Sequence, residues 1–135
     1  MTKVLKNIIL SIATFTSFSL FAQVVDVPWT GTPGEFEAGS EISKIMKNSI
    51  PCGLSRALKK DIDACHESLK HAPRFRIHTF ISTSPLHMKH KLEMTNDQVL
   101  DAIKESVTYA RNFTDDVEWS CEDGTRTDLD FMCKT

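Results

Sequence analysis

The sequence has little of what several protein classes require. Glycine and proline each contribute five of the 135 residues, which excludes collagen-like and low-complexity chains. Positive charge is not in excess: the formal net charge is −2, which argues against a nucleic acid partner. The sequence contains no C-x-x-C pair, phosphate loop, nucleophile elbow or dinucleotide fingerprint. At 135 residues it is also too short for a complete eight-stranded α/β barrel, which takes roughly 250.

The first residues form a pattern of their own. Lys3 and Lys6 precede an uncharged, largely apolar stretch from Asn7 to Val25, which contains the small residue Ala22. A basic start, an apolar centre and a small residue at a possible cleavage site are typical of a secretory signal peptide. We therefore expect a signal-like segment at 1–22, a linker at 23–31 and one domain at 32–135. An uncleaved anchor and a non-native start are the alternatives for the first segment.

The cysteines allow two interpretations. Their even count fits the disulfides of an exported protein, whereas the position of at least two in predicted strands fits buried free thiols. We favour free thiols, and pairing remains the alternative. The four are Cys52, Cys65, Cys121 and Cys133.

Helical and strand patterns alternate after residue 32. Thr32 with Glu35, and Thr95 with Gln98, form capping boxes that predict helix starts, and Thr127 is expected to cap a last helix. The first helix is expected to turn apolar residues inward, among them Ile45. Short strands are predicted at 50–54, 76–83 and 117–121. This order indicates βαβ units and an α/β fold with a parallel sheet.

The last predicted strand carries the first candidate site. Side chains alternate along a strand, so Glu118, Ser120 and Glu122 share one face. Carboxylates and a hydroxyl at the carboxyl end of a parallel strand are typical of α/β active sites. A solvated edge strand explains the same pattern equally well. His78 lies within the preceding strand, where a histidine is more often a core residue than a functional one.

Several longer motifs carry a family resemblance. They are Cys52 to Arg56 (CGLSR), Arg76 to Lys89 (RIHTFISTSPLHMK) and Tyr109 to Asp128 (YARNFTDDVEWSCEDGTRTD). From about residue 32 to its end, the chain resembles 2-isopropylmalate synthase. Homocitrate and citramalate synthases are close relatives, but the run from Arg111 to Glu118 favours isopropylmalate synthase.

The resemblance implies a fold and an activity. The family fold is a (β/α)8 TIM barrel, of which this chain would carry about three parallel strands, the third to fifth. Family members are acyltransferases that condense acetyl-CoA with 2-oxoisovalerate in leucine biosynthesis. A divalent metal ion polarises the keto group, and acetyl-CoA is the co-substrate. The resemblance further implies a cytoplasmic homodimer, which the signal-like start contradicts.

It also implies roles for individual residues. Glu122 would be catalytic. Ser120 and His78 would bind the substrate near the keto acid, and Leu54 would line the pocket for its side chain. The resemblance thus makes His78 a pocket residue.

Parts of the family pattern have no match in this sequence. They are an Arg-Asp pair whose Asp binds the metal, the two metal-binding histidines of a later strand, and a leucine-sensing region. We therefore expect no metal ligands, and no activity of this chain alone. The alternative is an exported, non-catalytic relic that acts as an interaction module, with itself or a partner, or has no function.

Overall fold

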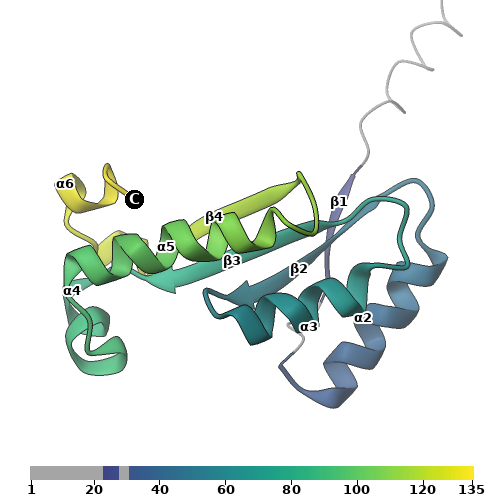
Figure 1. Ribbon diagram of the computed structural model, residues 1–135, viewed down its shortest axis with the longest axis horizontal. Coiled ribbons are helices and arrows are strands. Elements are labelled where there is room, and N and C mark those ends of the chain that lie inside the picture. The colour runs from purple at the N-terminus through teal and green to yellow at the C-terminus, as the bar shows by residue number, and fades with distance from the viewer. Residues whose placement is uncertain (1–22, 28–30) are drawn as a thin grey trace, which may run out of the picture.

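The computed structural model describes residues 23–27 and 31–135, which form a parallel sheet with helices between the strands (Figure 1). The sheet has four strands in the order β1-β2-β3-β4, which is also their order in the sequence. They are β1 (Val24–Val27), β2 (Ile50–Arg56), β3 (Arg76–Ser82) and β4 (Val117–Glu122). The helices are α2 (Pro33–Ile45), α3 (Lys59–Leu69), α4 (Pro85–His87), the π-helix η2 (Met88–Leu92), α5 (Asn96–Ala110), the 3-10 helix η3 (Gly124–Arg126) and α6 (Leu129–Met132).

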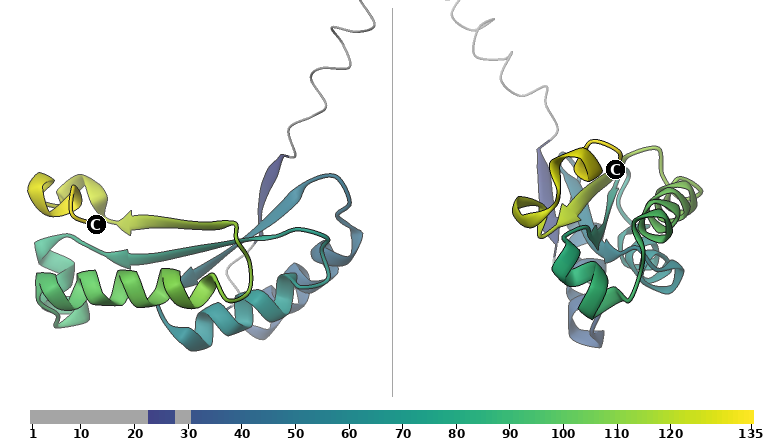
Figure 2. Two further views of the ribbon diagram at one scale, coloured as in Figure 1. Left: turned by 45° about the horizontal axis from the view of Figure 1, so that its top comes forward. Right: turned by 90° about the vertical axis from the view of Figure 1, so that its left-hand side faces the viewer.

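The three long helices α2, α3 and α5 lie on one side of the sheet (Figure 2). We call the side that they cover the helix face and the other the open face. Parallel strands joined by helices in sequence order form the repeating unit of a (β/α)8 barrel. The predicted α/β class and the partial barrel are therefore confirmed.

Apolar side chains of alternate strand residues fill the space between the sheet and the helices. Val27, Ile77 and Ile81 point to the helix face and are at most 8% exposed. One cluster joins Val27 and Ile77 to α3 and the end of α5, and a second joins Ile81 to the start of α5 and to α6. Burial of this kind is the main favourable contribution to folding.

Gly53 lets α3 approach the sheet closely. A Cβ at this position would lie 2.4 Å from Cys65 Sγ and 2.8 Å from Leu69 Cδ1, and both of those residues are fully buried. Such distances are shorter than van der Waals contact allows, so a glycine is required at the centre of β2.

Both predicted capping boxes are present. Thr32 accepts a hydrogen bond from the backbone of Glu35, whose side chain accepts one in return, and Thr95 and Gln98 are paired in the same way. These reciprocal bonds satisfy backbone N–H groups that a helix start leaves unpaired. All four cysteines are free thiols, as favoured, with Cys52 and Cys65 buried.

Three local expectations differ from the structure. Val24–Val27 form a fourth strand within the stretch 23–31 that was predicted to be a linker, because parallel pairing with β2 orders it. Ile45 is 74% exposed at the end of α2 and not turned inward, since α2 packs through small residues such as Gly39 and Ser43. The last helix is capped by the side chain of Asp128, one residue after the predicted Thr127. The predicted signal-like segment 1–22 lies outside the described residues.

Candidate functional site

The open face of the sheet collects polar side chains from neighbouring strands. Strand register places Leu54 beside His78, and His78 beside Glu118. Ser120 and Glu122 follow on the same face of β4, because side chains alternate along a strand. The structure therefore brings all four predicted site residues, Leu54, His78, Ser120 and Glu122, to one face.

His78 and Ser120 are in direct contact. The Nε2 atom of His78 lies 2.7 Å from Ser120 Oγ, which is hydrogen-bond distance. The opposite ring nitrogen, Nδ1, lies 4.0 Å from an oxygen of Glu118. The imidazole is thus held between two polar groups of β4, with its side chain 21% exposed. It is therefore not a packed core residue.

Glu122 belongs to a second group of contacts at the carboxyl ends of the strands. The Nζ atom of Lys91, in η2, lies 2.7 Å from each of its carboxylate oxygens. The hydroxyl of Ser82, at the end of β3, also donates to it. We call Ser82, Lys91 and Glu122 the carboxylate cluster.

These contacts set the ionisation of Glu122. Partial burial alone would raise its pKa, but the hydrogen bonds from Lys91 and Ser82 and the charge of Lys91 lower the pKa below the ordinary value of 4.5. The group is therefore a carboxylate at neutral pH. In this state it can accept hydrogen bonds, and it can accept a proton once Lys91 moves away.

A hollow of about 280 Å³ opens beside the carboxylate cluster. It lies between the carboxyl ends of β2 and β3 and the segment that carries Lys91. Leu58, Phe80 and Leu92 supply apolar walls, and Lys91 and Glu122 supply charge. Apolar walls with a few convergent polar groups are the usual make-up of a small-molecule site.

Sequence reasoning did not identify Ser82 or Lys91. Ser82 could have been found, since it is four residues from His78 on one strand and therefore shares its face. No pattern in the sequence indicates Lys91, because its position depends on the π-helical turn at Met88–Leu92 and on the left-handed Glu93 that ends it.

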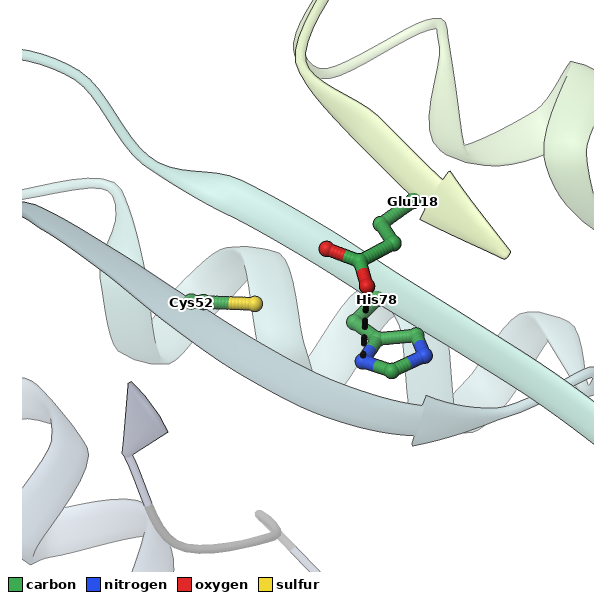
Figure 3. Close-up of side chains that lie close together, drawn as sticks. All are labelled: Cys52, His78 and Glu118. Carbon is green, nitrogen blue, oxygen red and sulfur yellow. Dashed lines mark ion pairs between the residues drawn. The ribbon is translucent and has the colours of Figure 1, made fainter. Parts of the chain in front are cut away.

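Within residues 23–27 and 31–135, one group of three side chains has the geometry to hold a metal ion. It consists of Cys52, His78 and Glu118, whose ligand atoms all lie within 4.8 Å of one another (Figure 3). Its thiol, imidazole and carboxylate differ from the carboxylate and two imidazoles that the family resemblance implies. The group does not fit that implied metal site, so we derive no step of the reaction through the family's metal ion.

Burial, together with the nearby carboxylates of Asp26 and Glu118, raises the pKa of the Cys52 thiol to about 12. Cys65, in α3, is buried against the helix face of the sheet, and this burial raises the pKa of its thiol to about 12 as well. Neither thiol is a nucleophile at neutral pH, because the thiolate is the reactive form.

None of the helices in the described part of the chain is both long enough and apolar enough to span a membrane.

Comparison with known proteins gives a consistent result. The model of the HMGL-like family matches residues 22–135. The 2-isopropylmalate synthase of Rhodopseudomonas palustris strain TIE-1 is 60% identical over an alignment of 114 residues, which covers 82% of this chain and 22% of that protein. The 2-isopropylmalate synthase of Bradyrhizobium sp. strain ORS 278 is 58% identical over an alignment of the same length, which covers the same fractions of the two chains. The chain thus spans less than a quarter of the length of these relatives.

Proposed function

Because the chain belongs to the HMGL-like family, we propose that it forms part of the active site of a 2-isopropylmalate synthase. The reaction would join the acetyl group of acetyl-CoA to the keto carbon of 2-oxoisovalerate, followed by thioester hydrolysis and release of CoA. The observation that carries the proposal is the convergence of Leu54, His78, Ser120 and Glu122 on the open face. These are the residues for which the resemblance implies pocket roles.

The keto acid would bind between β2 and β4. His78 can donate a hydrogen bond to a keto or carboxylate oxygen once a substrate displaces its contact with Ser120. Ser120 can then bond to the same oxygen or to its neighbour. Leu54, beside His78 on the next strand, would contact the branched apolar end of the substrate.

Glu122 would act on the acetyl-CoA side of the reaction. Its carboxylate is ionised, so it can orient a water molecule and accept its proton during thioester hydrolysis. For this to happen at least one of its oxygens must leave Lys91. The hollow next to it gives a thioester carbonyl space to approach. Acetyl-CoA is an intracellular metabolite, so we place this function in the cytoplasm.

A chimeric enzyme tests the proposal directly. Residues 22–135 would replace the matching segment of the R. palustris TIE-1 protein, and CoA release would be followed with and without 2-oxoisovalerate. We expect keto-acid-dependent CoA release. Glu122→Gln should lower kcat by roughly 100-fold or more, which is the usual contribution of a general base.

His78→Ala should raise the KM for 2-oxoisovalerate and leave the KM for acetyl-CoA nearly unchanged. The matched control is His71→Ala, because His71 is an exposed histidine in the turn that follows α3. Wild-type CoA release by the Glu122→Gln chimera, or an equal effect of the two histidine substitutions, would contradict the assigned roles.

A further inference from the structure

We infer that Cys52, His78 and Glu118 form a binding site for a thiophilic divalent cation such as Zn²⁺, separate from the metal that the family resemblance implies. The site lies on the open face across β2, β3 and β4 (Figure 3). Nothing in the proposed synthase reaction uses the Cys52 sulfur. The inference goes beyond the proposed function and does not depend on it.

The donor set fits this class of cation. Zn²⁺ is bound by cysteine sulfur, histidine nitrogen and carboxylate oxygen, whereas Mg²⁺ and Ca²⁺ take oxygen ligands. In tetrahedral zinc sites the ligand atoms are about 2.0–2.3 Å from the ion, which puts them roughly 3.3–3.8 Å apart. Here the three atoms already lie within 4.8 Å of one another, and His78 Nδ1 is 4.0 Å from Glu118 Oε1. Side-chain rotations alone can therefore close the site.

The sheet holds the ligands in place before any ion binds. His78 and Glu118 are paired directly across β3 and β4, and Cys52 lies diagonally from His78 on β2. Side chains in such positions on one face are near neighbours, and backbone hydrogen bonds fix all three strands. The remaining coordination position faces the open side, where a water molecule can enter.

The surroundings of the ligands match those of known metal sites. A metal-binding histidine usually donates its second ring N–H to another group, which fixes the ring and its tautomer. His78 has this arrangement: Nε2 lies 2.7 Å from Ser120 Oγ, while Nδ1 faces Glu118. The second oxygen of Glu118 accepts a hydrogen bond from Arg76 at 2.9 Å, so one oxygen is held and the other faces the site.

The local charge also favours a cation. The carboxylates of Asp26 and Glu118 both lie near the sulfur of Cys52, and the guanidinium of Arg76, which also lies nearby, is paired with Asp116 and Glu118. Asp26 is the register partner of Cys52 on β1 and is exposed. A dication bound by the sulfur and by Glu118 would compensate this negative charge, and the thiol proton would leave to solvent.

The first test is a titration of the reduced full chain with Co²⁺ and then with Zn²⁺. Co²⁺ bound to a thiolate gives a sulfur-to-cobalt charge-transfer band in the near ultraviolet, and Zn²⁺ should remove it by displacement. We expect one equivalent of each ion to bind. Absence of the band at saturating Co²⁺ would overturn the inference.

Variants then locate the ion. Cys52→Ser should abolish the charge-transfer band, whereas Cys133→Ser, the matched control at an exposed free thiol, should leave it unchanged. Glu118→Gln should weaken Zn²⁺ binding at least tenfold. This variant should keep its fold, because the Glu118 side chain is 44% exposed, so its Zn²⁺ affinity can be compared with that of the unaltered chain. Ser120→Ala should weaken binding by roughly tenfold, which is typical of the loss of a group that orients a histidine ligand.

Far-ultraviolet circular dichroism of each metal-free variant confirms that the fold is kept. A band that survives Cys52→Ser, or that disappears in Cys133→Ser, would place the ion on another cysteine and refute the site. Unchanged Zn²⁺ affinity in folded Glu118→Gln would also refute it.

Discussion

The two faces of the sheet are built from the same strands but differ in the side chains they carry and in how far these are buried. Ile77 points to the helix face and is fully buried, while its neighbour His78 points to the open face and contacts Ser120 and Glu118. The helix face carries large apolar side chains, together with the small polar side chains of Ser55 and Thr79, and all of these are buried on the side that α2, α3 and α5 cover. The open face keeps polar groups in contact with each other. Stability and chemistry are thus assigned to alternate residues, and substitutions at adjacent positions should have different consequences.

The largest expected loss of stability comes from a substitution on the helix face. Ile77→Ala should lower the free energy of unfolding by about 2–5 kcal/mol, because it removes buried methyl groups and leaves a cavity. His78→Ala, one residue away, should cost about 1 kcal/mol or less, which is the usual value of one hydrogen bond. Urea denaturation of both variants measures the difference. Equal losses would mean that the two faces contribute alike to stability.

A smaller effect is expected where the helix face is most closely packed. Gly53→Ala places a Cβ within 2.4 Å of Cys65 Sγ, and such overpacking should cost about 1–3 kcal/mol. The matched control is Gly34→Ala in the first turn of α2, where no atom lies within 4 Å. The control should stabilise the chain by up to about 1 kcal/mol, since alanine favours the helix. Thermal melting of the two variants should therefore shift in opposite directions, and a shift of the same sign would contradict the close approach.

The smallest effect concerns the open face. Lys91→Met removes the partner that lowers the pKa of Glu122, so this pKa should rise toward or above its ordinary value of 4.5. Because the native pKa is lowered, the ion pair stabilises the fold above about pH 4.5, and this contribution is lost as the pH falls through the native pKa. Half-exposed pairs contribute at most about 1 kcal/mol.

The pKa of Glu122 can be measured by NMR titration of its carboxyl carbon. The control variant is Lys89→Met, which changes an exposed lysine of the same segment. An unchanged Glu122 pKa in Lys91→Met would show that Ser82 and the backbone surroundings, and not Lys91, set its ionisation.

The sequence predicted the strands that carry the site because their residues follow local rules. Alternation placed Glu118, Ser120 and Glu122 on one face, and the register confirms that shared face. The capping boxes at Thr32 and Thr95 were also predictable, since they depend on side chains three residues apart. The catalytic and substrate-binding roles of these residues remain predictions.

Other features depend on contacts between distant segments and left no local pattern. β1 has only four residues, and its place in the sheet depends on pairing with β2, which lies beyond α2 in the sequence. The proximity of Cys52 to His78 and Glu118 follows from the register of three strands, which the sequence does not specify. Lys91 reaches Glu122 through a π-helical turn whose geometry the sequence does not reveal.

The strand order has a consequence for how the chain folds. Each strand pairs with the strand that precedes it in the sequence, so every pairing closes one helix-containing connection. The entropy lost in closing such a loop grows slowly with its length, and these connections are short compared with the whole chain. A domain built this way can add one strand and one helix at a time, in the order in which the ribosome delivers them. No described strand has to wait for a distant part of the chain before it finds its neighbour.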